Sequence, residues 1–201
     1  MNVAQFAVAC LIGAIGAYIV IQAKNVRYVK SGEKTYRVVN SPNYQAAADA
    51  LAKLEAHVKD LLQKCETVVP GNRHFANIRA RWSGNLREID GNDSSIAYSV
   101  GKKDIWICVR KRDGTIENFN DTMFVLLHEL SHIANETYGH NDDFWKTFKF
   151  VLEVAERTGV YAFQDYGRQS VQVCGKDIST TPLACVKNGE CFSELGPIRP
   201  L

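Results

Sequence analysis

Residues 128–145 read HELSHIANETYGHNDDFW, and the interpretation of the whole chain depends on this stretch. His128 and His132 are four residues apart, so on a helix both imidazoles project from one face, one turn apart, and can share a metal ion. Glu129 lies beside the first histidine and can reach a water at the metal without being a ligand itself. The spacing therefore predicts a zinc-binding helix that carries its own general base.

A catalytic zinc ion needs a third protein ligand and an open fourth position. His140 is the candidate, because Tyr138 and Gly139 allow the chain to turn back after the first helix and present His140 before the next helix begins. Three of the five histidines of the chain lie in this short segment. The alternative is a pair of core histidines that are held by hydrogen bonds and bind no metal.

Zinc in such a site lowers the pKa of a bound water to about 7 and polarises a substrate carbonyl. Glu129 would take the proton as the water attacks and deliver it to the leaving amine. The oxyanion that forms needs a further donor, for which Tyr161 and Tyr166 are the candidates. The strand DIWICVR, residues 104–110, could bind an extended peptide as an added strand if it lies at the sheet edge above the zinc.

A long helix is predicted near the start of the domain, with Ser41 as its N-cap and Pro42 at its first helical position. Apolar residues then recur at the spacing of one buried helical face as far as Cys65. A second, shorter helix is expected over residues 75–82.

The helix that carries the motif would be capped by Asn120 or Asp121. A final helix would begin after Asn141 and end at Gly159, with acidic residues in its first turn, where the helix dipole favours them.

Strand patterns lie between the two groups of helices. They cover residues 86–90, 95–100 and 104–110, and the last two runs flank Gly101-Lys102, which predicts a hairpin. Helices and strands that alternate in this irregular way indicate an α+β domain with a small sheet.

No charged residue occurs between Val3 and Ala23. As a helix this segment would span roughly 30 Å, the thickness of the hydrocarbon core of a bilayer. A cleaved signal peptide is the alternative, but it would begin with basic residues, whereas here they follow the segment from Lys24 onward. We therefore expect a retained membrane anchor, with the C-terminal domain on the cytosolic side, where flanking Lys and Arg residues tend to stay.

The charge balance and the cysteines bear on the partners and the compartment. A net charge of +2 over 201 residues is too small to indicate nucleic acid as the main partner. In a cytosolic domain, Cys65 and Cys108 would be reduced thiols in the core. Cys174, Cys185 and Cys191 lie close together near the C-terminus and could form one disulfide, which the sequence leaves open.

The segment VLLHELSHIANETYGHNDDFWKTFKFVLEVA, residues 125–155, resembles the WLM and SprT-like families of zinc peptidases. These families share the HExxH motif, a further histidine before an Asp/Asn-rich helix start, and an aromatic pair like Phe144-Trp145. The wider pattern, over residues 35–183, resembles membrane-anchored metallopeptidases of large DNA viruses. SprT-like DNA-repair peptidases usually carry a zinc-binding or DNA-binding extension, and this chain has no four-cysteine zinc pattern and no strongly basic tail.

The resemblance implies a compact zincin-like domain of the minigluzincin type, in which a small sheet packs against the active-site helix. It also implies a Zn²⁺ ion bound by His128, His132 and His140, with Glu129 as the catalytic base.

The sequence as a whole predicts four segments. They are a transmembrane anchor at 1–23, a polar connector at 24–40, the metallopeptidase domain at 41–165 and a C-terminal tail at 166–201 that lies on or near the domain. Within the connector, Tyr36 and Val38 indicate a short strand near TYRVV, residues 35–39. The expected function is that of a membrane-anchored, zinc-dependent metalloprotease that acts on a protein or peptide. The alternative is a membrane-tethered scaffold or minor capsid protein, in a virion or on an internal membrane of the host, whose zincin-like domain binds other virion proteins.

Overall fold

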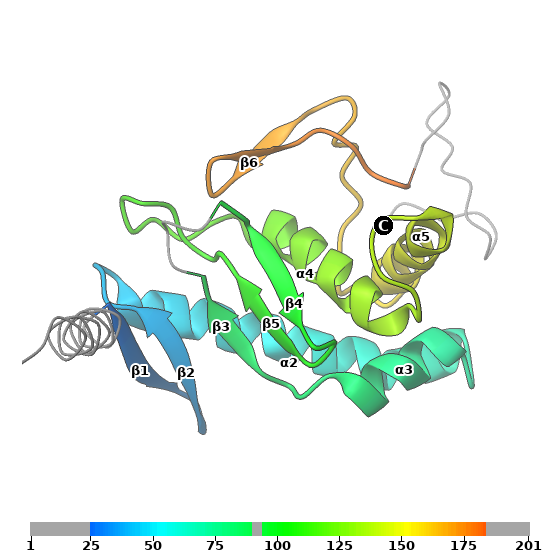
Figure 1. Cartoon of the computed structure of the whole chain (residues 1–201), viewed down its shortest axis with the longest axis horizontal. Coiled ribbons are helices and arrows are strands. Elements are labelled where there is room, and N and C mark those ends of the chain that lie inside the picture. Colours follow the sequence, from blue (N-terminus) through cyan, green and yellow to red (C-terminus); the bar gives the residue numbers. More distant parts are fainter. Residues whose placement is uncertain (1–24, 90–93, 184–201) are drawn as a thin grey trace, which may run out of the picture.

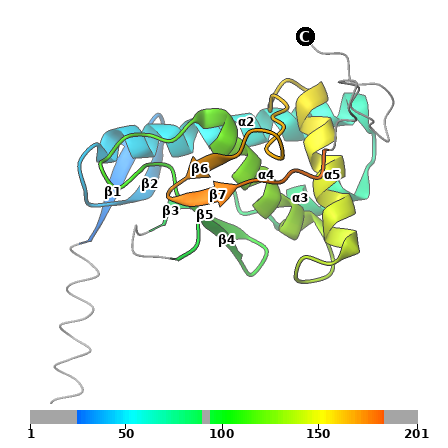
Figure 2. The same ribbon diagram turned by 90° about the horizontal axis from the view of Figure 1, so that it is seen from above.

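The computed structural model describes residues 25–89 and 94–183. The elements follow in the order β1 (Val26–Ser31), β2 (Lys34–Val39), α2 (Tyr44–Val68), α3 (Arg73–Arg81), β3 (Leu86–Glu88), β4 (Ala97–Val100), β5 (Asp104–Ile107), α4 (Phe119–Ala134), α5 (Asp142–Arg157), β6 (Val171–Val173) and β7 (Lys176–Ile178). Helix α2 runs along the domain, with β1 and β2 at one end and α3 and α5 at the other (Figures 1 and 2). The predicted α+β class is confirmed.

Helix α2 buries one face along its whole length, as its apolar spacing predicts. The buried residues on this face are Ala47, Ala48, Leu51, Leu54, Glu55, Val58, Leu61 and Cys65. The start of the helix was predicted wrongly, because Asn43 occupies the cap position with φ 63° and Ser41 and Pro42 both lie outside the helix. Asn tolerates this left-handed conformation better than most residues do, so the chain turns there.

Helices α4 and α5 begin at asparagine caps. The side chain of Asn118 accepts hydrogen bonds from the backbone N–H groups of Asn120 and Asp121. The predicted caps, Asn120 and Asp121, are therefore wrong, and the cap is Asn118. The N–H groups of the first turn have no partner within the helix, and the side chain of Asn118 satisfies two of them. Asn141 accepts from the N–H of Phe144, which confirms the predicted start of α5.

The three-stranded sheet has the order β3-β5-β4, with β3 parallel and β4 antiparallel to β5. The predicted hairpin at Gly101-Lys102 joins β4 and β5. Residues 104–110 could bind a peptide only from a sheet edge, and this condition is not met, since β5 is central and β4 is at the edge. Strand β3 comes from before the hairpin and takes the free side of β5, a pairing that local pattern does not reveal.

Residues 24–40 were expected to be a polar connector with a short strand near residues 35–39. That strand is β2, and it pairs with β1 in an antiparallel hairpin over residues 26–39. Val29, Tyr36 and Val38 are buried in the core of the domain. A buried ion pair holds the end of this hairpin, because Glu88 accepts from the N–H of Val39 at 2.6 Å and from Nε of Arg110 at 2.6 Å. The folded unit therefore includes the segment that precedes residue 41.

The β6–β7 hairpin lies on the other side of α4 from α2 (Figure 1). Cys174, in its turn, forms a disulfide with Cys108, which follows β5. The expectation that Cys108 is a reduced core thiol is therefore wrong, because the fold brings together two cysteines that are 66 residues apart. Cys65 is free and buried, and Cys185 and Cys191 lie outside the described residues.

The predicted membrane anchor, residues 1–23, also lies outside the described residues. Within residues 25–89 and 94–183, no helix combines the length and the apolar character that crossing a bilayer requires.

Candidate metal centre

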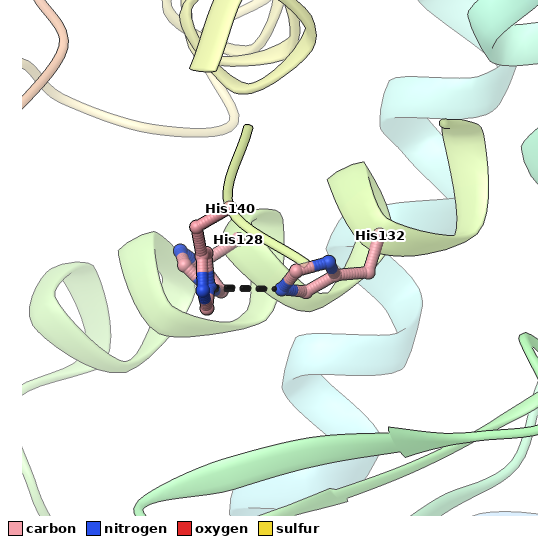
Figure 3. A group of neighbouring side chains, drawn as sticks. All are labelled: His128, His132 and His140. Carbon is pink, nitrogen blue, oxygen red and sulfur yellow. Dashed lines mark hydrogen bonds between the residues drawn. The ribbon is translucent and has the colours of Figure 1, made fainter. Parts of the chain in front are cut away.

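Helix α4 presents His128 and His132 from one face, and the loop after it brings His140 back to them (Figure 3). The Nε2 atoms of His128 and His140 are 3.0 Å apart, and the Nε2 atom of His132 is 3.2 Å from each of the other two. The loop passes through Gly139 at φ 79°, a conformation that favours glycine and returns the chain toward the helix. The structure therefore brings together the three histidines that the sequence singled out, in a cluster that could bind a metal.

Aromatic residues of α5 pack against the three imidazoles. The ring of Phe144 stacks on His132, with centroids 4.1 Å apart and an interplanar angle of 23°. Phe148 meets His128 edge-on at 5.1 Å, and the ring of Trp145 lies 5.8 Å from that of His140. This packing limits the rotation of the imidazoles. This role was not predicted from the sequence, although Trp145 and Phe148 follow Phe144 at the spacing of one helical face.

Burial and mutual repulsion keep two of the imidazoles neutral. Burial, followed by the nearby His132 and His140, lowers the pKa of His128 to about 3. Burial also lowers the pKa of His132 to about 4, with smaller contributions from His140 and Lys102. A neutral imidazole offers a nitrogen lone pair to a metal, so both side chains are in the protonation state that a ligand needs at neutral pH.

Glu129 is buried between α4 and the edge strand β4. Its burial raises the carboxyl pKa to about 7, although hydrogen bonds from the side chain and backbone of Ser99 act in the opposite direction. A carboxyl group with a pKa near 7 can both accept and release a proton at neutral pH. Ser99 was not recognised from the sequence, because its contact depends on the pairing of β4 with β5.

A cavity of about 480 Å³ opens beside these residues. Its lining contains all three histidines and Glu129, together with residues of β4, the β4–β5 turn, the His140 loop and β7. Tyr98 and Tyr138 are among them, and the side chain of Tyr138 is 81% exposed. The cavity is large enough to receive a side chain and the adjoining backbone of a bound polypeptide.

Tyr161 and Tyr166 do not line this cavity. Both are buried beside α4, where their rings lie 6.1 Å and 4.7 Å from the ring of Phe124. The hydroxyl of Tyr166 donates to Asp121, and burial raises the pKa of Tyr161 to about 12. The tyrosines that line the cavity are instead Tyr98 and Tyr138.

Comparison with known proteins gives relatives among viruses. No family model matches the chain. The 136R protein of Invertebrate iridescent virus 6, described as uncharacterized, is 29% identical over 79 residues, which cover 38% of this chain and 44% of that protein. The crystal structure of Wss1 from Saccharomyces cerevisiae aligns with 61% of this chain and 89% of its own, at 18% identity and a TM-score of 0.46.

Uncharacterized protein R325 of Acanthamoeba polyphaga mimivirus is 31% identical to this chain over 179 residues. The match covers 82% of this chain and 90% of the viral protein. The chain therefore belongs to the family of viral proteins that includes R325 of mimivirus.

Proposed function

We propose that this protein is a zinc-dependent metallopeptidase of the WLM/SprT-like kind, with a zincin-like catalytic domain. The observation that carries the proposal is the convergence of three histidine Nε2 atoms, 3.0 to 3.2 Å apart, next to the buried carboxyl group of Glu129. The HExxH spacing on α4 and the third histidine in the following loop support the same chemistry.

The donor set fits zinc. With Zn–N bonds of 2.0–2.1 Å and tetrahedral geometry, two ligand nitrogens should lie about 3.3 Å apart. The distances between the three Nε2 atoms are slightly shorter than this value. All three histidines line the cavity, so an ion that they held could also bind a water or a substrate atom from the cavity.

When bound, zinc would polarise the scissile carbonyl and make a water molecule more acidic. His128, His132 and His140 would hold the ion. Glu129 would accept a proton from the attacking water and pass it to the leaving amine nitrogen. Ser99 hydrogen-bonds to the carboxyl group of Glu129 and so orients it toward the cavity.

Strand β4 provides a site for the peptide backbone. Among the described residues it pairs with β5 on one side, and residues 97–99 line the cavity. An extended peptide could therefore add to the sheet along β4 and pass in front of Glu129. Strand β4 would then bind the peptide by strand addition, the role considered above for residues 104–110.

Localisation stays a prediction. The basic residues after the apolar segment at 3–23 favour a domain on the cytosolic side of a membrane. The disulfide between Cys108 and Cys174, in contrast, is typical of an oxidising compartment. The alternative function, a virion scaffold that binds other capsid proteins, also stays a prediction, and it would require a fixed, high copy number in purified particles.

Glu129→Gln tests the proposal, because it removes the base and leaves the three histidines in place. The full-length wild type and the variant should contain similar amounts of zinc by elemental analysis, and only the wild type should cleave a mixture of unstructured peptides, as read by mass spectrometry. Glu33→Gln, an exposed site in the β1–β2 turn, is the matched control and should cleave like the wild type. Equal cleavage by Glu129→Gln, or a folded wild type without zinc, would refute the proposed function.

A further inference from the structure

Lys102 lies in the β4–β5 turn, and its ammonium group reaches the loop that follows α4. Its Nζ atom donates to the backbone carbonyls of Asn135 at 2.5 Å, Glu136 at 3.0 Å and Thr137 at 3.2 Å. An ammonium group has three donors, and here all three serve consecutive carbonyls of one loop. Nζ also lies 4.5 Å from the centre of the Tyr138 ring, a favourable cation–π contact.

These carbonyls belong to the segment that connects α4 with His140. The last carbonyls of a helix lack intrahelical partners, and a positive charge is favourable beside them. Arg81 also donates to the carbonyls of Ile133 and Asn135, at the helix end itself. Lys102 extends this support to the next two carbonyls of the loop, the second of which is three residues before His140.

The other end of Lys102 is held rigidly. Gly101 and Lys102 have φ values of 58° and 54°, and they lie in a tight turn that the N–H of Lys103 closes by donating to the carbonyl of Val100 at 3.0 Å. Residues with a Cβ disfavour this left-handed conformation. The surrounding contacts must therefore hold Lys102 in a conformation that a lysine backbone does not prefer. The same hairpin carries Ser99, which hydrogen-bonds to Glu129. One turn therefore connects the strand beside the base with the loop of the third histidine.

We propose that Lys102 is a positioning residue, which sets His140 against His128 and His132 by fixing the carbonyls of the loop. The inference rests on the metal centre of the proposed function. Without the ammonium group, the loop would sample conformations in which the imidazole of His140 is withdrawn. Zinc would then be held mainly by the two histidines of α4.

Lys102→Met tests this, because methionine keeps an unbranched side chain at the same backbone conformation and lacks the charge. Zinc affinity of the full-length protein, measured by competition with a chromophoric chelator, should fall by about 10-fold or more, as expected when a partner that orients a ligand is lost. Lys103→Met removes the same charge from the neighbouring exposed residue and should leave the affinity unchanged.

The double-mutant cycle with His140→Ala separates positioning from a general effect on the fold. If Lys102 acts through His140, then Lys102→Met should have little further effect on zinc affinity once His140 is gone. The same loss in both backgrounds, or wild-type affinity in Lys102→Met, would overturn the inference.

Circular dichroism of the metal-free variants shows whether each one is folded. Lys102→Gln, which keeps an amide donor, is the second variant, and it should bind zinc more tightly than Lys102→Met does. If both variants unfold, Lys102 serves the fold and the positioning role is refuted. If the wild type binds zinc but cleaves no peptide, the peptidase function fails and the result for Lys102 still stands; a wild type that binds no zinc overturns both.

Discussion

The disulfide between Cys108 and Cys174 gives a stability prediction whose size follows from the structure. It joins the residue after β5 to the turn of the β6–β7 hairpin, across a sequence separation of 66 residues. For a loop of this length, the chain entropy that the crosslink removes from the unfolded state corresponds to about 4 kcal/mol at 25 °C. Domains of this kind are stable by only about 5–15 kcal/mol, so the crosslink should account for a large share.

The folded state should change much less than the unfolded state when the bond is cut. Val173 and Ile178 of the hairpin are buried, and the backbone N–H of Cys174 donates to Glu117 at 2.7 Å. These contacts remain after reduction, so the hairpin is expected to stay in place at low denaturant concentration. Ile178 lines the cavity, which makes the hairpin part of the proposed active site.

The assay is urea unfolding, followed by tryptophan fluorescence, with and without a reducing agent. Reduction should lower the free energy of unfolding of the wild type by about 4 kcal/mol. The double variant Cys108→Ala, Cys174→Ala should have the same free energy of unfolding as the reduced wild type. The reducing agent should not change this value. Cys65→Ala, which removes the buried free thiol, should lose as much unfolding free energy on reduction as the wild type does. Identical unfolding of the oxidised and reduced wild type would refute the reasoning, as would two free thiols at these positions.

Two further predictions concern buried carboxylates. Glu88→Gln should lower the free energy of unfolding in urea by about 3–5 kcal/mol, because it leaves the buried guanidinium of Arg110 without its counter-charge. A loss below about 1 kcal/mol would contradict this, because it is the size expected for a solvent-exposed salt bridge. At Glu55, burial would raise the carboxyl pKa, but hydrogen bonds from Lys34, Lys59 and the neighbouring tyrosine hydroxyl outweigh it and hold the pKa below its usual value. A lowered pKa in the folded state stabilises the fold at neutral pH, and this contribution is lost as the pH falls through that pKa. The difference in unfolding free energy between the wild type and Glu55→Gln should therefore narrow below about pH 4, and a constant difference down to acidic pH would contradict it.

The features predicted correctly from the sequence are those that depend on near neighbours in the chain. The apolar face of α2 and the shared face of His128 and His132 follow from helical periodicity. The cap at Asn141 and the hairpin at Gly101-Lys102 follow from local turn and capping chemistry. His140 could be singled out as well, because it lies between two helices that the same patterns predict.

The errors come from pairings between distant segments. The two sides of β5 are occupied by strands from different parts of the chain, so the position of β4 at the edge is decided by the sheet as a whole. Residues 24–40 were expected to be a connector apart from a short strand at 35–39, because the partner strand β1 and its contact with α2 are decided only by the fold. Tyr161 and Tyr166 were the candidates for an oxyanion donor, but both are buried against Phe124 and neither lines the cavity.

The sequence by itself determined the types of the metal ligands, their spacing on one helix and the acidic residue beside them. The reason is that residues four positions apart on an α-helix lie on the same face, whatever the rest of the fold is. Only the tertiary structure decided that Ser99 meets Glu129, that Lys102 holds the loop before His140 and that Cys108 meets Cys174. Each of these contacts joins elements whose relative positions are set by burial of the shared core. The free energy gained by burial is roughly proportional to the apolar area removed from water and is not directional. Contacts between distant segments that depend on it therefore have no short sequence motif.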